Sequence, residues 1–302
     1  MKKKQNKLPD FFINAFYESK FRDNLFIIKA SGSVIEDEKA RSNLMSNIRE
    51  LKLRGIKVIL IYGGGLAIDA ALESRGIEIK KTNGRRITDS ETIQVIREVI
   101  GGDLSLRVME SMQHNDLRGL SFNAIPADWM KIGLRPKKPI DFGFVGDIHD
   151  VYTRPVQRLL KTADFIACPC LALAESGELC NINADTIATA LAKTLKADKL
   201  IFMSNVDGVK IDGETAMMIT SDEIPSLIEK GIVTDGMRVK MENCVDALNA
   251  GVKRIHLING LRDNALHAEI FESVGPGTML LHADERDNYM NEVNVQKAIG
   301  GK

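Results

Sequence analysis

The sequence predicts an α/β protein with an open, mainly parallel central sheet sandwiched by helices, and with β-hairpin excursions at the carboxyl ends of the strands. Short apolar runs alternate along the chain with helical patterns, which is typical of βαβ units. The runs are short and mainly apolar, which fits burial on both faces of the sheet. With 302 residues, 44% of them hydrophobic, the chain can form a full core.

The apolar runs predict strands at 25–30, 57–62, 119–125, 164–168, 199–204 and 253–258. The periodic segments between them predict helices at 36–53, 66–75, 90–113, 183–195, 221–230, 237–250 and 264–272. Asn183 stands at an N-cap position, and Asp185 follows in the first turn, where the helix dipole favours a carboxylate.

Two segments interrupt this alternation. Residues 77–88 contain Asn83-Gly84 between extended flanks, which is a strong hairpin signal. Residues 132–152 have the turn residues and β-branched content of further hairpins, and the basic stretch 130–139 is expected to be a solvated loop. Ligands of open α/β sheets bind at the carboxyl ends of the strands, where these excursions are expected to lie.

The overall charge favours a small-molecule partner. Forty-one basic and forty-one acidic residues cancel, so nothing global favours nucleic acid or an anionic membrane. The first seven residues carry four lysines, but no uninterrupted apolar stretch follows them, and no run reaches the length of a membrane span. A cytoplasmic protein is expected.

The cysteines do not suggest a disulfide framework or a metal site. Cys168 and Cys170 flank Pro169 without an adjacent histidine, and Cys180 and Cys244 lie apart from them. Buried, reduced thiols are expected. The chain also lacks the G-x-x-x-x-G-K-[ST] loop and the G-x-G-x-x-G dinucleotide motif, so any phosphate must be bound by another arrangement.

Three consecutive glycines, Gly63 to Gly65, follow the apolar run 57–62 and precede a helical pattern. Such a turn offers clustered backbone N–H groups to a carboxylate or a phosphate. It is equally well explained as a tight strand-to-helix turn that needs glycine for close packing. Its interpretation therefore depends on residues elsewhere.

Three further segments carry polar groups that suit phosphate chemistry. Lys29 ends the first strand beside the small-residue turn Ser31-Gly32. Asp185 lies in the first turn of the helix at 183–195, and Lys240 lies in the first turns of the helix at 237–250. Because strand ends and helix starts meet at one edge of such a sheet, Lys29, Asp185 and Lys240 are expected to converge.

In this combination the chain resembles the amino acid kinase family over residues 25–281, and within it the branch that phosphorylates N-acetyl-L-glutamate. The matching segments, in order, are KASGS (29–33), GGG (63–65), NGRRIT (83–88), GFVGDI (143–148), NINADT (181–186), SNVDGV (204–209), GIVTDGMRVK (231–240) and GPGTML (275–280). Each segment alone is weak evidence, whereas eight in the same order are strong evidence.

The resemblance implies an enzyme that forms N-acetylglutamyl 5-phosphate from ATP in the second step of arginine biosynthesis. It implies that Lys29 and Lys240 stabilise the transferred phosphoryl group, that Asp185 orients them, and that Mg²⁺ is carried by ATP oxygens and water rather than by protein ligands. The implied acceptor site comprises Gly64, Gly65, Arg86 and Asn181. The implied ATP site comprises Ser31, Gly32, Ser204, Asn205, Val206, Asp207, Gly208, Val209, Ile232, Val233 and Thr234.

The chain departs from the family pattern at two positions near these residues. Ser31 stands where a first glycine is usual, and Tyr62 stands where a histidine usually precedes the three glycines. Neither is one of the three charged residues. These departures therefore concern rate and substrate preference rather than the class of reaction.

The resemblance also predicts how the chain is organised. Residues 1–24, with the apolar stripe Phe11, Phe12, Ala15 and Phe16, are expected to form an N-terminal helical extension. Residues 25–302 form the kinase domain, with a substrate lobe at about 25–180 and a nucleotide lobe at about 181–302. In arginine-regulated members such an extension joins dimers into a hexamer, so a homo-oligomer and an arginine effector site near 269–278 are expected. Asn264 and Pro276 depart from the usual effector segment.

Three alternatives remain open from the sequence. A related kinase that acts on aspartate or carrier-bound aminoadipate would differ in the hairpin around Arg86. An acetylglutamate synthase would need an acetyltransferase domain, for which the 21 residues after Leu281 are too few. A non-catalytic effector-binding subunit would be expected to lose Lys29, Asp185 or Lys240, and all three are present.

Overall fold

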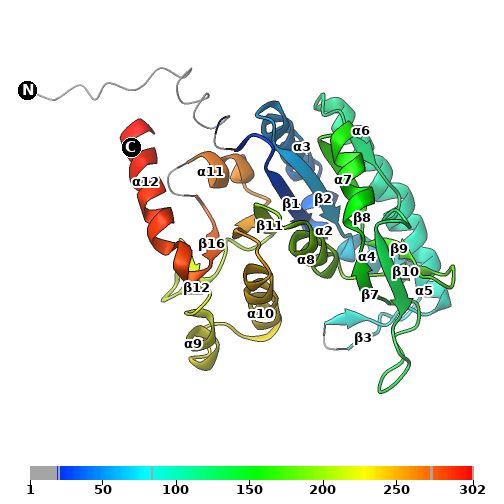
Figure 1. The fold of residues 1–302 in the computed structure, drawn as a ribbon. Helices are drawn as coiled ribbons and strands as arrows, with labels where there is room; N and C mark the ends of the chain where they lie inside the picture. Colours follow the sequence, from blue (N-terminus) through cyan, green and yellow to red (C-terminus); the bar gives the residue numbers. More distant parts are fainter. Residues whose placement is uncertain (1–18, 20, 83, 273–274, 301–302) are drawn as a thin grey trace, which may run out of the picture.

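The computed structural model describes residues 19, 21–82, 84–272 and 275–300. One eight-stranded sheet forms its centre, in the strand order β14-β16-β15-β11-β1-β2-β8-β5 (Figure 1). The six strands from β15 to β5 are parallel, whereas β16 is antiparallel to β15 and β14 follows the direction of β16. The predicted fold class is confirmed.

The strands of the central sheet are β1 (Leu25–Ala30), β2 (Lys57–Tyr62), β5 (Leu120–Ser121), β8 (Phe165–Pro169), β11 (Lys199–Ser204), β14 (Met218–Thr220), β15 (Arg254–Asn259) and β16 (Thr278–Leu281). Four antiparallel pairs lie outside it: β3 (Lys81–Thr82) with β4 (Arg85–Arg86), β6 (Met130–Leu134) with β7 (Gly146–Val151), β9 (Leu171–Leu173) with β10 (Leu179–Asn181), and β12 (Lys210–Ile211) with β13 (Glu214–Thr215).

The α-helices are α2 (Gly32–Glu36), α3 (Glu38–Leu53), α4 (Gly65–Ser74), α5 (Ser90–Ile96), α6 (Ser105–His114), α7 (Thr153–Thr162), α8 (Ala184–Leu195), α9 (Ile224–Glu229), α10 (Asp235–Asn249), α11 (Ala265–Phe271) and α12 (Arg286–Gly300). A π-helix, η1 (Arg97–Leu104), joins α5 to α6, and a 3₁₀ turn, η2 (Ala283–Glu285), precedes α12.

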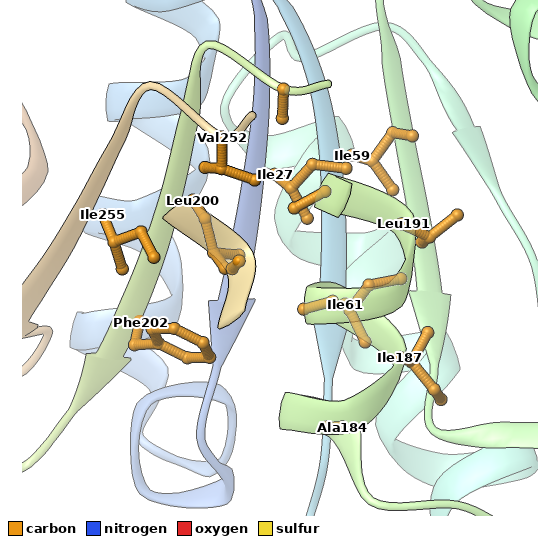
Figure 2. Packing of buried hydrophobic residues seen from close by; sticks show 14 of the residues in the cluster. Ile27, Ile59, Ile61, Ala184, Ile187, Leu191, Leu200, Phe202, Val252 and Ile255 are labelled. Atoms are coloured by element: carbon orange, nitrogen blue, oxygen red, sulfur yellow. The ribbon is translucent and has the colours of Figure 1, made fainter. Parts of the chain in front are cut away.

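The core has two parts, one on each face of the sheet. Ile27 faces α8 with the other residues of one cluster, whereas Phe26 and Ile28 belong to the cluster on the opposite face, because successive side chains of a strand alternate. Figure 2 shows the first cluster, in which Ile187 and Leu191 of α8 lie over the sheet. The continuous apolar strands are therefore buried on both sides, as predicted.

Several helices begin at residues whose side chains cap the first turn. The Asp37 carboxylate accepts a hydrogen bond from the N–H of Ala40, at 2.8 Å, at the start of α3. The predicted cap of α8 is also present: Asn183 Oδ1 accepts from the N–H groups of Asp185 and Thr186, at 2.8 and 3.1 Å. The cap places Asp185 in the first turn of α8, at the carboxyl edge of the sheet.

Two predicted elements differ from those found. The helix at 90–113 is continuous, but its middle is the π-helix η1, which contains the adjacent glycines Gly101 and Gly102. The strand at 119–125 shortens to β5, because the chain bends after Ser121 and the Asn123 side chain donates to the Gly101 carbonyl, at 2.5 Å. Neither difference alters the pattern of apolar residues in the sequence. A π-helix changes only the hydrogen-bond register of the backbone, and a bend at the sheet edge changes only the path of the chain.

The prediction that residues 130–139 form a solvated loop is wrong for their first half. Residues 130–134 are strand β6, paired with β7, and Met130 and Ile132 are buried. Lys131, which lies between them, pairs with Glu175 at 3.3 Å, and the other basic residues of the stretch, Arg135, Lys137 and Lys138, follow the strand. The other hairpin prediction is confirmed, since β3 and β4 pair as expected, although Asn83 lies outside the described residues.

The proposed division into lobes remains a prediction, as does the N-terminal extension, whose apolar stripe at Phe11, Phe12, Ala15 and Phe16 lies outside the described residues. Phe21 is described, and its ring packs edge-on against those of Phe26 and Phe271. Within the described ranges, no helix combines the length and apolarity that crossing a membrane requires.

Candidate active site

A cavity of about 320 Å³ opens beside the carboxyl ends of β1, β2 and β8. Ligands of open α/β sheets bind at such strand ends. Seven of the predicted site residues line the cavity: Lys29, Ser31, Gly32, Gly64, Gly65, Arg86 and Asn181. The structure thus brings the predicted acceptor residues together with the turn that follows β1.

Asp185 lies between the two lysines predicted to be catalytic. Its carboxylate oxygens are 2.9 Å from Nζ of Lys29 and 3.4 Å from Nζ of Lys240. Burial alone would raise the pKa of Asp185, but the positive charges of Lys29 and Lys240 outweigh burial and hold the pKa below its ordinary value. Asp185 is therefore ionised at neutral pH, and the expected convergence of these three residues is confirmed.

The two glycine turns touch each other, so each needs glycine for close packing. A Cβ atom on Gly32 would lie 2.8 Å from the backbone nitrogen of Gly65. A Cβ atom on Gly64 would lie 2.2 and 2.6 Å from the Cδ1 atoms of Leu104 and Ile100. The packing explanation therefore holds for Gly64 but not for Gly65, where a Cβ atom would meet nothing within 4 Å. It is compatible with an anion site because Gly64 and Gly65 also line the cavity.

Arg86 reaches the cavity from the β3–β4 hairpin, and its side chain is only 8% exposed. Its Nη2 lies 2.6 Å from Asp69 Oδ1, whereas its Nη1 is buried without a hydrogen-bond partner among the described residues. A buried guanidinium nitrogen that lacks a partner is costly unless a ligand supplies an acceptor. Arg86 thus has one nitrogen fixed by the protein and one available for an anion.

Asp69, which holds Arg86, was not predicted from the sequence. It lies in α4 and also pairs with Lys81, at 2.7 Å. Burial alone would raise the pKa of Asp69, but the bonds from Lys81 and Arg86 lower it below its ordinary value. The available signal was an acidic residue four positions after Gly65 within the otherwise apolar segment LAIDAAL.

A second arginine, Arg135, directly follows β6 and lines the cavity, although the sequence placed it in a stretch expected to be a solvated loop. Its Nε lies 3.1 Å from both carboxylate oxygens of Asp147, and its guanidinium lies over the Phe142 ring. Asn181 ends β10 and donates to Thr88 Oγ1, at 3.4 Å. Both hairpin excursions therefore contribute walls to the cavity.

The remaining predicted ATP residues do not line this cavity. Ser204 ends β11, and the loop after it is fixed by Asp207, which accepts from Asn259 Nδ2 at 2.9 Å and pairs with Arg262. Val206 and Ile232 are 44% and 37% exposed, so both side chains can contact a ligand at the surface. The residues Asn205, Gly208, Val209, Val233 and Thr234 lie in the same two segments, 204–209 and 232–234. Nucleotide binding there remains a prediction.

No protein metal site is apparent in the part of the chain that the structure describes: no three His, Cys, Asp or Glu side chains cluster there. At the active site, Asp185 pairs with two lysines and Asp147 with Arg135. The four cysteines are buried and unbonded, and burial raises the pKa of each thiol. The expectation of buried thiols is confirmed.

A second, smaller cavity of about 40 Å³ lies at the opposite end of β11 and β15. Its wall contains a buried row in which Lys199 Nζ lies 2.9 Å from His256 Nε2, and His256 Nδ1 lies 2.7 Å from Glu269 Oε1. The second carboxylate oxygen of Glu269 accepts from the N–H of Gly277, at 3.0 Å. A neutral imidazole with its proton on Nδ1 satisfies both neighbours, because Lys199 can only donate and the ionised Glu269 can only accept.

This arrangement predicts a pH dependence of stability. Burial, followed by the charge of Lys199, lowers the pKa of His256 to about 4. Between the ordinary value near 6.5 and about 4, the unfolded chain binds a proton that the folded chain does not, so stability is lost as the pH falls through this window. At about pH 5 the loss from His256 alone is expected to be roughly 2 kcal/mol relative to pH 7.

Urea unfolding at the two pH values measures this contribution. His256→Gln keeps groups that can accept from Lys199 and donate to Glu269 but cannot titrate, so we expect its loss of stability on acidification to be smaller than that of the parent by about that amount. His149→Gln, which removes an exposed histidine, is the matched control. Equal pH dependence in parent and His256→Gln would contradict the assignment.

Comparison with known proteins identifies close relatives by sequence. The model of the amino acid kinase family matches residues 24–259. The chain is 32% identical over 278 residues to acetylglutamate kinase of Clostridioides difficile (strain 630), with 89% of this chain and 95% of the relative covered. It is 35% identical over 274 residues to acetylglutamate kinase of Halothermothrix orenii (strain H 168), with coverages of 88% and 93%.

Solved structures extend the comparison to the fold. N-acetylglutamate synthase from Neisseria gonorrhoeae, complexed with coenzyme A and N-acetyl-glutamate, superposes with a TM-score of 0.80 at 22% identity, covering 95% of this chain and 68% of that one. Carbamate kinase from Giardia lamblia bound to AMP-PNP superposes with a TM-score of 0.58 at 17% identity, with coverages of 86% and 99%. At these identities the likeness concerns the fold.

Proposed function

Because the chain belongs to the amino acid kinase family, we propose that it transfers the γ-phosphoryl group of ATP to the side-chain carboxylate of N-acetyl-L-glutamate, giving N-acetylglutamyl 5-phosphate and ADP. This is the second step of arginine biosynthesis. The observation that carries the proposal is the placement of Asp185 between Lys29 and Lys240, beside a cavity that also contains Arg86.

The reaction needs charge stabilisation more than acid–base catalysis. A side-chain carboxylate with an ordinary pKa near 4.3 is ionised at pH 7, so one of its oxygens can attack the γ-phosphorus directly while the bond to the bridging oxygen of ADP breaks. Two anions must be aligned, and charge on the phosphoryl oxygens must be balanced. Lys29 and Lys240 supply that charge, and Asp185 keeps both ammonium groups in place.

The acceptor is proposed to occupy the cavity. The buried Nη1 of Arg86, together with Nη2, which now bonds Asp69 and, at 3.4 Å, the Gly65 carbonyl, can bind the α-carboxylate of acetylglutamate with charge-assisted hydrogen bonds. Gly64 and Gly65 can offer backbone N–H groups to the acyl portion, and Asn181 can bind the amino acid portion. Arg135 is an additional cation at this cavity, already neutralised by Asp147.

ATP is proposed to lie between Ser31-Gly32 and the segments 204–209 and 232–234. The exposed apolar side chains of Val206 and Ile232 would cover the base. Magnesium would neutralise phosphate charge, and its ligands would come from ATP and water, since Asp185 and Asp147 are already paired with cations. A cytoplasmic location is part of this proposal.

One assay separates this function from its alternatives. Purified protein is incubated with ATP, Mg²⁺ and hydroxylamine, which traps an acyl phosphate as a hydroxamate, and with N-acetylglutamate, glutamate or aspartate as acceptor. Hydroxamate with N-acetylglutamate alone supports the proposal. Product with aspartate instead would indicate another acyl-phosphate-forming kinase, and folded protein without any product would favour a non-catalytic subunit.

We further propose L-arginine as an effector at the smaller cavity. A solved relative in fold, N-acetylglutamate synthase from N. gonorrhoeae, was crystallised with coenzyme A and L-arginine. Two acidic residues line this cavity, Glu269 and Glu292, and Glu292 already binds the guanidinium group of Arg254, which an arginine effector would have to replace. A volume of about 40 Å³ is close to that of one water molecule, so the cavity must open to admit arginine. Adding L-arginine to the hydroxamate assay tests whether it inhibits the reaction. The homo-oligomer is a separate proposal, and light scattering tests it by measuring the mass of the protein in solution.

A further inference from the structure

The π-helix η1 lies directly behind the glycine turn that is proposed to receive the acceptor. In a π-helix each N–H bonds the carbonyl five residues earlier, and such segments are rare and frequently found at functional sites. Here the segment is eight residues long, and both neighbours, α5 and α6, are ordinary α-helices. Something must therefore hold the wider register in place.

Two buried hydroxyl groups hold it. Ser105 Oγ donates to the carbonyl of Ile100, five residues earlier, at 2.7 Å, and Tyr62 Oη lies 3.0 Å from Ser105 Oγ. A serine hydroxyl has a single proton, which here goes to Ile100, so the phenol of Tyr62 is the donor to Ser105. Tyr62 is fully buried, and burial raises the pKa of its phenol above the ordinary value, so the phenol keeps its proton at neutral pH.

The same segment contacts the glycine turn on its other side. The Cδ1 atoms of Ile100 and Leu104 occupy the space in which a Gly64 side chain would lie. Gly64 is only two residues after Tyr62 in the chain. The turn is thus held at two points. The backbone connects it directly to Tyr62, and the side chains of Ile100 and Leu104 press on it from a segment that Ser105 links to the same tyrosine.

Tyr62 does not itself reach the cavity. The cavity lining contains Gly63, Gly64 and Gly65 but neither Tyr62 nor Ser105. Any influence of the phenol on a bound acceptor must therefore pass through the glycine turn. The ring can serve the core without the hydroxyl, since it belongs to the apolar cluster on that face of the sheet.

We propose that Tyr62 is a positioning residue for the acceptor: its hydroxyl, acting through Ser105 and the Ile100 carbonyl, fixes the π-helix and thereby the place of the Gly64-Gly65 turn. The inference rests on the proposed role of that turn in binding the acceptor. The nucleotide segments 204–209 and 232–234 lie elsewhere. The proposed phosphate turn at Gly32 touches Gly65, but Ile100 and Leu104 press on Gly64, so the larger effect is expected on acceptor binding.

The kinetic test uses Tyr62→Phe, Ser105→Ala and the double variant. Each single change should raise the KM for N-acetylglutamate about tenfold and leave kcat and the KM for ATP within about twofold. Because the two hydroxyls act in series, the KM for N-acetylglutamate should also rise about tenfold in the double variant, rather than about a hundredfold. Tyr152→Phe, which removes the hydroxyl of a half-exposed tyrosine, is the matched control and should have no effect.

A purely structural role gives a different pattern. Lower thermal stability of Tyr62→Phe with an unchanged KM for N-acetylglutamate would overturn the proposal, as would effects of the two single changes that multiply in the double variant. An equal rise in the KM values for ATP and N-acetylglutamate would also overturn it, because the coupling would then not be specific to the acceptor turn.

Hydrogen exchange of the unliganded protein tests the physical link without any catalytic activity. In Tyr62→Phe, amides of both 97–105 and 63–68 should exchange about tenfold faster than in the parent, whereas Tyr152→Phe should match the parent. Faster exchange in 97–105 alone would overturn the link to the glycine turn. If the parent fails to phosphorylate N-acetylglutamate, the proposed function fails, while this exchange result still decides whether Tyr62 positions the turn.

Discussion

Replacing Lys240 with alanine is expected to lower kcat about a thousandfold while the KM for N-acetylglutamate changes by no more than about threefold. The Lys240 ammonium lies 3.4 Å from Asp185 and 5.0 Å from the centre of the Phe202 ring, at the edge of the site rather than in the acceptor cavity. Its charge is therefore proposed to act on the oxygens of the phosphoryl group during transfer, and not on the bound acceptor.

The kinetics of this variant need two controls. Lys39→Ala removes an exposed lysine that also pairs with an aspartate, Asp263 at 2.8 Å, and it should leave both parameters unchanged. Thermal unfolding should show Lys240→Ala to be folded, since Asp185 keeps Lys29 as a partner. A large rise in KM with an unchanged kcat would place Lys240 in substrate binding and contradict the assignment.

Arg86→Ala is expected to raise the KM for N-acetylglutamate about a hundredfold with kcat within a few-fold of the parent, because a charge-assisted, two-pronged contact contributes roughly 2 to 3 kcal/mol. The buried and unpartnered Nη1 is the basis of this expectation. Arg86→Lys should recover only part of the loss, since an ammonium group cannot make the paired contact. Arg286→Ala, which removes an exposed arginine on α12, is the control.

A substrate analogue identifies the group that Arg86 binds. N-acetylglutamate with its α-carboxylate converted to an amide should bind the parent about as weakly as the natural acceptor binds Arg86→Ala. The Arg86→Ala variant should bind the analogue only slightly more weakly than it binds N-acetylglutamate, because the contact with the α-carboxylate is already absent. Full additivity of the two changes would show that Arg86 contacts another part of the acceptor.

The sequence was sufficient to predict the parts of the fold that have strong local patterns. The strands at 25–30, 57–62 and 199–204 each contain a run of at least four apolar residues, and they were found at the predicted bounds. Strands β14 and β16 have three and four residues, which is too short for a pattern to be recognised, and they were missed. The π-helix was missed because its side chains follow a helical pattern and only the hydrogen-bond register differs.

The candidate site was predictable where its residues stand in ordered motifs. Lys29, Asp185 and Lys240 were identified in this way and converge in the structure. Asp69 and Arg135 were not identified, because their importance comes from pairings across the hairpins with Arg86 and Asp147. Such pairings depend on how the hairpins fold over the sheet, and no local pattern records that arrangement.

The position of β1 at the middle of the sheet has a consequence for how such an enzyme can change. Strand β1 pairs with β2 on one side and with β11 on the other, and Lys29 ends it. The proposed acceptor residues Gly64, Arg86 and Asn181 all come from the chain between β2 and α8, and the proposed nucleotide loops follow β11. Insertions or substitutions in the first half can therefore reshape the acceptor pocket without disturbing strand pairing beyond β11. A sheet ordered in this way lets a lineage acquire a new acceptor while it retains its phosphoryl donor.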